Sequence, residues 1–142
     1  MAIRVIDFNS NHYREMLILR ENILRKPLGL SFDADDLKDE HKHIHIGFYD
    51  EDKLEGCCML VPIDSSTVQL RQMAVTSGLQ GKGIGRSIMQ FAENIARDMG
   101  FKKMIMHARK TALGFYKKLE YRQVGEEFSE VNIPHLFLEK QL

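Results

Sequence analysis

Residues 67–86 read TVQLRQMAVTSGLQGKGIGR, and this stretch decides the fold. Its first half, Thr67 to Thr76, is rich in apolar and β-branched side chains and predicts a strand. Its second half has glycines at alternate positions from Gly81 to Gly85 and leads into an amphipathic helix predicted over Ile84 to Met99. Glycines between a strand and a helix let the main chain turn tightly and bring its N–H groups close to a ligand.

The start of this helix is predicted to bind an anion. Its first N–H groups have no acceptor within the helix, and the helix dipole adds partial positive charge there. A pyrophosphate fits such a loop best, and Lys82 and Arg86 can add charge-assisted contacts. No window matches the Gly-x-x-x-x-Gly-Lys-Ser/Thr pattern of a P-loop, and the spacing differs from the Gly-x-Gly-x-x-Gly dinucleotide fingerprint. A turn that serves chain reversal alone is the remaining alternative.

The rest of the chain supplies further strands and helices around this stretch. Strands are predicted over Ile3 to Phe8, His43 to Tyr49, Gly56 to Pro62, Lys103 to Ala108, Arg122 to Phe128 and His135 to Lys140. Helices are predicted from Tyr13 to Leu24, within Ser31 to His41, and from Ala112 to Leu119. Caps for the first of these are offered by residues 9–11, NSN, and its stop by Pro27 and Gly29. Gly100 is the predicted stop of the helix over Ile84 to Met99, and residues 50–53, DEDK, are predicted to form the turn of a hairpin. A meander of strands followed by a strand–helix–strand crossover implies a mixed sheet with helices on both faces. The expected fold class is α/β (α+β), with a single, mostly antiparallel sheet of six or seven strands.

Length and composition limit the function classes. The 142 residues predict a single domain over residues 1–142, long enough to bury a hydrophobic core. Lys plus Arg and Asp plus Glu number 20 each, and this zero net charge argues against a dedicated nucleic-acid binder. No apolar run approaches the roughly 20 residues of a membrane span, and the start shows no signal-peptide pattern. Cys57 and Cys58 are adjacent in an apolar run, so we expect no disulfide scaffold and a cytoplasmic location.

Several motifs, in order along the chain, resemble the GNAT superfamily of acetyl-CoA-dependent N-acyltransferases. The family signature for pyrophosphate is Gln/Arg-x-x-Gly-x-Gly/Ala, and residues 80–85, QGKGIG, match it. Residues 112–121, ALGFYKKLEY, are similar to the family's Ala-x-x-Phe-Tyr-x-x-Leu-Gly-Phe helix. Residues 125–135, GEEFSEVNIPH, resemble the tail of the ElaA-like branch of small bacterial acetyltransferases. The resemblance covers residues 67–142 and implies a GNAT-type sheet.

The resemblance implies an N-acetyltransferase that uses acetyl-CoA (coenzyme A) as co-substrate, with no metal. A primary amine of a small molecule or peptide would attack the acetyl carbonyl directly within a ternary complex. By the same resemblance, the central strand pairs with the pantetheine arm, and the glycine-rich loop holds the pyrophosphate. The implied cofactor-binding residues are Met73, Ala74, Val75, Gln80, Gly81, Lys82, Gly83, Ile84, Gly85, Arg86, Tyr116 and Arg109, which stands where many members have Asn.

The resemblance also places Tyr116 as the general acid for the CoA thiolate, since a phenol can donate a proton at neutral pH. An aromatic side chain that packs the helix on the sheet is the alternative role for this residue. The general base is less defined, because Gln69 stands where histone-acetylating relatives have a glutamate. His107, at a strand end, is the candidate base. The other candidates are His135, Glu130, the acidic residues near Glu40, and a water relay.

Two other functions stay open from the sequence. One is a non-catalytic acyl-CoA-binding sensor on the same fold, because Gln69 is not a carboxylate. The other is a phosphate- or nucleic-acid-binding module that uses basic residues such as Lys82 and Lys102. The neutral net charge and the absence of stacking aromatics among these residues argue against that module. A homodimer through the tail strands is a further expectation, and no membrane partner is expected.

Three smaller features complete the expectations. His41, His43 and His45 alternate and are expected to be solvated strand residues rather than metal ligands. The acidic run from Asp33 to Glu40 is expected to be a solvated surface helix. Glu120 stands where the family commonly has glycine, and it is expected to weaken the C-cap of the preceding helix.

Overall fold

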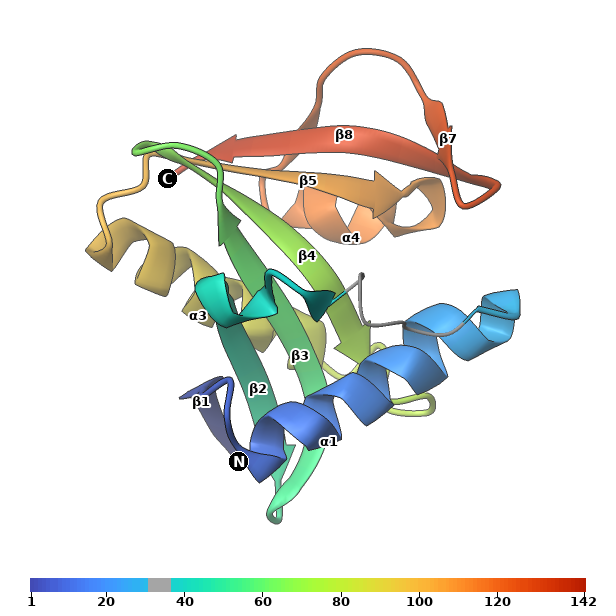
Figure 1. Cartoon of the computed structure of the whole chain (residues 1–142). Helices are drawn as coiled ribbons and strands as arrows, with labels where there is room; N and C mark the ends of the chain where they lie inside the picture. The colour runs from blue at the N-terminus through green and yellow to red at the C-terminus, as the bar shows by residue number, and fades with distance from the viewer. Residues whose placement is uncertain (31–36) are drawn as a thin grey trace. The chain divides into compact units, whose positions relative to one another are not determined.

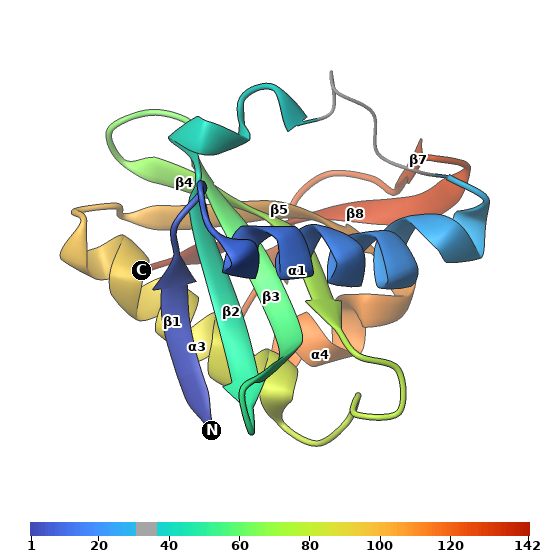
Figure 2. The same ribbon diagram turned by 60° about the horizontal axis from the view of Figure 1, so that its bottom comes forward.

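The computed structural model describes residues 1–30 and 37–142. The strands are β1 (Ala2–Ile6), β2 (Ile44–Asp50), β3 (Lys53–Pro62), β4 (Thr67–Val75), β5 (Lys103–Arg109), β6 (Arg122–Gln123), β7 (Phe128–Glu130) and β8 (Ile133–Gln141). Within the described ranges, the α-helices are α1 (Asn11–Arg20), α3 (Ile84–Asp98) and α4 (Leu113–Lys118), labelled in Figures 1 and 2. Most of the helix predicted within Ser31 to His41 lies outside the described residues.

The hydrogen-bonded strand order is β1-β2-β3-β4-β5-β8-β6, with β7 paired to β8. This order confirms the predicted α/β fold with an open, mostly antiparallel sheet. The chain forms two compact units, residues 1–61 with 72–92 and residues 62–71 with 93–142. β4 and α3 therefore contribute residues to both units. The expectation of a single domain stays a prediction.

The first unit begins with an antiparallel meander, as the sequence predicts. β1 pairs with β2, and β2 pairs with β3. Asp50 and Lys53 are partners at the end of the β2–β3 pair, and Glu51 and Asp52 between them have φ of 49° and 64°. Two consecutive left-handed residues are typical of a type I′ turn, whose twist matches that of paired strands. The predicted hairpin is confirmed.

Helices cover both faces of β3 within this unit. Cys57 belongs to a buried cluster with Tyr13 and Met16 of α1, and both views show α1 lying across β2 and β3 (Figures 1 and 2). At the neighbouring residue, Gly56, a Cβ would lie 2.7 Å from Cδ1 of Ile88 in α3. Because successive strand residues point to opposite faces, α1 and α3 lie on opposite faces of β3, as predicted. The glycine lets α3 approach this strand closely.

The N-terminal helix begins and ends where the sequence indicates. The Ser10 side chain caps it by accepting a hydrogen bond from the main-chain N–H of Tyr13. α1 continues through a π-helical turn over Glu21–Arg25 and a 3-10 turn over Lys26–Leu28. Gly29, with φ of 71°, ends the helical path, so the predicted stop at this glycine is confirmed.

The second unit contains the predicted crossover. β4 and β5 pair in parallel, with α3 as the connection between them. β8 pairs antiparallel with β5, β6 and β7. The strand predicted over Arg122 to Phe128 is two short strands, β6 and β7, separated at Gly125, whose φ is 77°. With this separation, the part of the chain that the structure describes has eight strands in its sheet.

The α4 helix ends at a residue that is not glycine. The main-chain N–H of Glu120 donates to the carbonyl of Lys117, and that of Tyr121 donates to the carbonyl of Tyr116. These two bonds are those of a Schellman motif, which needs a left-handed residue after the helix. Glu120 supplies it with φ of 73°. The sequence analysis expects Glu120 to weaken this C-cap, and the structure has a strained main-chain conformation there.

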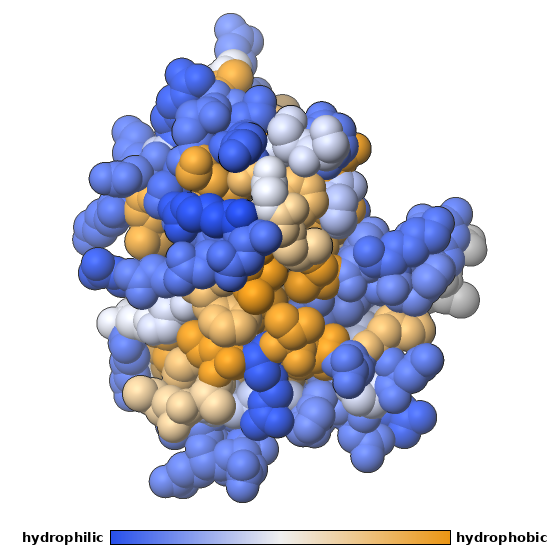
Figure 3. All heavy atoms as spheres, turned by 90° about the vertical axis from the view of Figure 1, so that its left-hand side faces the viewer, coloured by the Kyte–Doolittle hydropathy of each residue, from blue (hydrophilic) through white to orange (hydrophobic). Residues whose placement is uncertain are grey.

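The surface exposes several large apolar side chains among hydrophilic ones. Figure 3 shows mostly hydrophilic side chains on one face, with apolar areas between them. Large apolar side chains with high exposure include Val5, Ile18, Ile63 and Met99. Apolar atoms form more than half of the surface of ordinary folded proteins, so these exposures carry no functional argument alone.

In residues 1–30 and 37–142, no helix is long and apolar enough to cross a membrane.

Candidate functional site

The loop between β4 and α3 has the conformation that the glycines predict. Gly78, Gly81 and Gly83 have φ of 87°, 83° and 86°, in the left-handed region where other residues are strained. A Cβ built on any of the three would meet no heavy atom within 4 Å. Glycine is therefore required there by main-chain conformation, and the space beside the loop is open to a ligand.

Hydrogen bonds hold this loop to the strand and the helix that flank it. The Gln80 side-chain amide donates to the carbonyl of Val75 at 3.1 Å, and the N–H of Leu79 donates to the carbonyl of Thr76 at 3.1 Å. The N–H of Ser87 donates to the carbonyl of Gly83 at 3.0 Å, so Gly83 occupies the N-cap of α3. Gln80 thus anchors the loop to the end of β4.

The first turn of α3 presents the donors and charges of an anion site. Ser87 is the first residue of α3 whose N–H bonds to a carbonyl one turn earlier. The N–H groups of Ile84, Gly85 and Arg86 come before it and therefore have no partner within the helix. Lys82 and Arg86 are both exposed. The helix dipole favours negative charge at the same end. These residues therefore fit the diphosphate of a nucleotide such as coenzyme A.

The central strand β4 changes its pairing halfway along. Its register with β5 runs from Thr67↔Lys103 to Leu70↔Met106 and has no later pair. Gln72, two residues on, has φ of 56°, and its carbonyl accepts a hydrogen bond from Cys57 Sγ at 3.6 Å. Met73 and Val75 are half-buried, whereas Ala74 is buried.

The thiol next to this bend is not a nucleophile at neutral pH. Burial raises the pKa of Cys57 to about 12, so its sulfur keeps its proton and serves as a donor to the Gln72 carbonyl. Cys58 is buried as well, and burial raises its pKa well above the usual value. Neither cysteine suits covalent catalysis.

Three of the candidate bases lie together in the second unit. His107 Nδ1 is 3.1 Å from Glu130 Oε1, and the other oxygen of the same carboxylate is 3.5 Å from His135 Nε2. His107 is on β5, Glu130 ends β7, and His135 is on β8. The imidazole of His107 also contacts the ring of Phe128, with ring centroids 5.2 Å apart. The sequence placed these side chains on separate elements and gave no signal that they would meet.

Two other predicted site residues lie in the second unit. Tyr116 on α4 is 5% exposed, and its ring contacts those of Phe115 and Tyr121 at 4.9 Å and 5.7 Å between centroids. Arg109 ends β5, opposite His135 in the β5–β8 register. The burial of Tyr116 is compatible with both the acid role and the packing role that the sequence left open.

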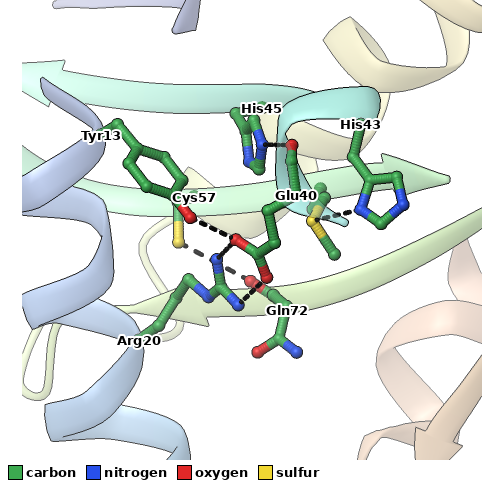
Figure 4. A network of polar contacts seen from close by, with 8 residues as sticks. Tyr13, Arg20, Glu40, His43, His45, Cys57 and Gln72 are labelled. Carbon is green, nitrogen blue, oxygen red and sulfur yellow. Dashed lines mark hydrogen bonds and ion pairs between the residues drawn. The ribbon is translucent and has the colours of Figure 1, made fainter. Parts of the chain in front are cut away.

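A buried polar cluster in the first unit was missed by the sequence analysis (Figure 4). Arg20 donates two hydrogen bonds of 2.7 Å to the two carboxylate oxygens of Glu40, and the Tyr13 hydroxyl donates to the same carboxylate at 2.8 Å. His45 Nε2 donates to the main-chain carbonyl of Glu40 at 2.8 Å. No sequence spacing links Arg20 with Glu40, so the pair is visible in the structure alone.

This cluster corrects two expectations. Glu40 is 3% exposed, so the end of the acidic run is not a solvated helix face; Asp33, Asp35 and Asp36 lie outside the described residues. His45 is 1% exposed, so the expectation of a solvated histidine is wrong there. His41 belongs to a 3-10 turn over Glu40–Lys42 rather than to β2. The three histidines therefore do not share a strand face.

Comparisons with known proteins agree on one family. Residues 7–121 match the family model described as Acetyltransferase (GNAT) family. The uncharacterized N-acetyltransferase YjcF of Bacillus subtilis is 31% identical over 139 residues, covering 96% of this chain and 97% of YjcF. Probable N-acetyltransferase 14 of Xenopus tropicalis is 31% identical over 88 residues, which are 59% of this chain and 43% of that protein. The chain thus spans nearly all of one relative and less than half of the other.

Solved structures share the fold. A Lactobacillus plantarum protein superposes with a TM-score of 0.88 at 24% identity, covering 100% of this chain and 99% of that one. ElaA of Escherichia coli gives 0.82 at 19% identity, covering 98% of both chains. An aminoglycoside 6′-N-acetyltransferase complexed with coenzyme A gives 0.81 at 18% identity, covering 99% of this chain and 97% of that one. At these identities, the likeness establishes the fold alone.

Proposed function

Because this chain belongs to the GNAT acetyltransferase family, we propose that it transfers the acetyl group of acetyl-CoA to a primary amine of a small molecule or peptide. The loop from Gly78 to Arg86 supports the proposal most strongly. Its three left-handed glycines, the open space beside them and the helix start that follows suit a pyrophosphate. A solved protein of the same fold holds coenzyme A.

In this proposal, the loop and the end of β4 bind the co-substrate. The free N–H groups of the first turn of α3 donate to the pyrophosphate, and Lys82 and Arg86 neutralise part of its charge. The main chain from Met73 to Val75 pairs with the pantetheine arm, as a short added strand. Arg109 takes the place of the asparagine that many family members direct to CoA.

The proposed reaction is a direct acyl transfer. The amine nitrogen forms a bond to the acetyl carbon, the thioester C–S bond breaks, and one proton passes in net from the amine to the CoA sulfur. His107 accepts the proton from the amine, and Tyr116 donates its phenol proton to the leaving thiolate. Both groups then exchange protons with solvent and return to their starting states. A positioned acid or base of this kind contributes roughly 10²–10⁴-fold in rate.

The assignment of Tyr116 is tested by Tyr116→Phe, which removes one hydroxyl and keeps the ring. We expect turnover, measured by thiol release over a panel of amines, to fall about 100-fold or more, while the Kd for CoA stays within about twofold. Tyr49→Phe, which removes a phenol hydroxyl bonded to His12 in the first unit, is the matched control and should keep wild-type turnover.

Two results would revise this account in different ways. Full turnover in Tyr116→Phe would leave Tyr116 with the packing role alone. CoA binding without turnover on any amine would favour the non-catalytic sensor that shares the fold.

A further inference from the structure

We infer that Glu130 is a positioning residue that holds His107 in the tautomer whose Nε2 is free to accept the proton of the acceptor amine. This inference rests on the proposed function and deepens it, because it gives the Glu130 carboxylate a role in the same proton transfer. The contact that carries it is between His107 Nδ1 and Glu130 Oε1, at 3.1 Å.

The chemistry of the two partners fixes the proton on His107. An ionised carboxylate accepts hydrogen bonds and donates none, so the His107 nitrogen facing Glu130 carries the proton. The other ring nitrogen, Nε2, then holds the lone pair in the neutral imidazole. A neutral histidine in water prefers the opposite arrangement, with the proton on Nε2. Glu130 therefore selects the tautomer in which the nitrogen remote from the carboxylate is the base, the role that a carboxylate plays beside a catalytic histidine in hydrolase triads.

His107 and His135, the other candidate base, differ in their hydrogen-bond partners and in their exposure. His135 Nδ1 is 2.8 Å from the carbonyl of Ile133, and a carbonyl only accepts, so Nδ1 carries the proton and Nε2 faces Glu130. The His135 side chain is 6% exposed, against 37% for His107. His107 is thus the imidazole that a substrate can reach, and His135 lies behind the carboxylate.

The β7–β8 turn holds Glu130 at this place. Glu130 and Ile133 are partners in the register, and the two residues between them, Val131 and Asn132, have φ of 47° and 61°. Such a two-residue turn fixes the register of its strands. Phe128, two residues before Glu130, packs its ring against both imidazoles, with centroids 5.2 Å from His107 and 6.0 Å from His135.

Charged residues of the neighbouring strands share the sheet face of His107. In the β5–β8 register, Arg109 is the partner of His135 and Phe137 is the partner of His107. On β4, Arg71 follows Gln69 by two residues, and Gln69 pairs with Ile105, so Arg71 shares the face of His107. Glu130 is the carboxylate in hydrogen-bond contact with His107. Its removal takes away that hydrogen-bond partner of His107.

The proton step is balanced within the proposed reaction. As the neutral amine forms its bond to the acetyl carbon, its nitrogen gives one proton to His107 Nε2, which becomes an imidazolium. The carboxylate of Glu130 stays ionised and stabilises that imidazolium through the Nδ1–H bond. Tyr116 gives one proton to the leaving sulfur, and the imidazolium and the phenolate then exchange protons with solvent, so that one proton passes in net from the amine to the CoA sulfur.

The first test is spectroscopic and needs no substrate. Long-range ¹H–¹⁵N spectra of the full chain report which ring nitrogen of His107 carries the proton at a pH where the ring is neutral. We expect the Nδ1–H form in the wild type and a shift toward the Nε2–H form in Glu130→Ala. Glu130→Gln keeps an acceptor oxygen and should retain more of the Nδ1–H form. Glu126→Gln, an exposed carboxylate of the same segment, is the control and should match the wild type.

The second test is kinetic and separates positioning from folding. For Glu130→Ala, we expect kcat/KM to fall about 10- to 100-fold, with the Kd for CoA within twofold of wild type. Glu130→Gln should recover part of the rate. A merely structural role for Glu130 would leave the tautomer of His107 unchanged.

Each outcome decides one claim. An Nε2–H tautomer of His107 in the wild type, or an unchanged tautomer in Glu130→Ala, overturns the positioning role. Unchanged kcat/KM in His107→Gln overturns it as well, since Glu130 would then position a residue that takes no proton. Failure of the wild type to bind CoA overturns the proposed function instead, and the spectroscopic test still decides the tautomer.

Discussion

Several residues that are not glycine adopt left-handed main-chain conformations, and they lie next to proposed functional groups. Gln72 bends the central strand with φ of 56°, Glu120 ends α4 with φ of 73°, and Val131 forms the β7–β8 turn with φ of 47°. Such conformations cost roughly 1–2 kcal/mol for residues with a Cβ. They persist where the surrounding structure requires them, and such sites often lie near functional groups.

At Glu120, the strain can be removed without touching the site. Glu120→Gly should raise the free energy of unfolding by roughly 1 kcal/mol, because glycine adopts the left-handed conformation after a helix without steric penalty. Urea denaturation followed by circular dichroism measures this change as a higher midpoint. Glu120→Ala loses the same carboxylate but keeps a Cβ, and it should give no such gain. Equal midpoints for the glycine and alanine variants would show that conformational strain at this residue is absent.

At the scale of elements, the Arg20–Glu40 ion pair links α1 to the turn that precedes β2. Its two hydrogen bonds of 2.7 Å and the added bond from Tyr13 satisfy a carboxylate that is 3% exposed. Breaking such a buried pair by removing one partner typically costs about 3–5 kcal/mol. Glu40 of this pair and His45, which bonds to the Glu40 main chain, each contribute to the pH dependence of stability.

We expect the free energy of unfolding to fall as the pH drops below about 6.5, the ordinary pKa of histidine. Burial lowers the pKa of His45 from that value, so the unfolded chain takes up this proton first and folding becomes less favourable. Burial alone would raise the pKa of Glu40, but its bonds to Arg20 and the charge of that guanidinium hold it below 4.5. This second contribution is present above pH 4.5 and is lost as the pH falls further.

The two contributions can be separated by denaturation at a series of pH values. His45→Gln should flatten the dependence between about pH 6.5 and 5, whereas His41→Gln, at an exposed histidine, should leave it unchanged. The same slope in all three proteins would show that His45 is protonated as readily in the folded chain as in the unfolded one.

The elements were predictable from local sequence, whereas the side-chain clusters were not. The glycine-rich loop, the hairpin at Glu51 and Asp52, and the helix stop at Gly100, whose φ is 92°, follow from turn chemistry and periodicity. The prediction of one strand over Arg122 to Phe128 was wrong, because the chain turns at Gly125 and forms two short strands. Apolar composition does not show where one short strand ends and another begins. The two clusters are built by side chains from separate elements, and pairing across 20 or more residues leaves no periodic signal.

At the scale of the whole molecule, the family assignment and the loop geometry converge on one ligand. Residues 7–121 match the family of CoA-dependent acetyltransferases, and Gly78, Gly81 and Gly83 leave open space next to the start of α3. A side chain at Gly83 would strain its left-handed conformation, and a carboxylate there would repel a pyrophosphate. Binding of CoA is therefore the property on which the remaining assignments depend.

Calorimetric titration of acetyl-CoA, CoA, NADH and ATP into the wild type and into Gly83→Asp tests this claim most directly. We expect the wild type to bind acetyl-CoA and CoA selectively and Gly83→Asp to lose that binding while remaining folded by circular dichroism. Equal CoA affinity in the two proteins, or no binding of CoA by the wild type, would contradict the assignment of the loop and the acetyltransferase function built on it.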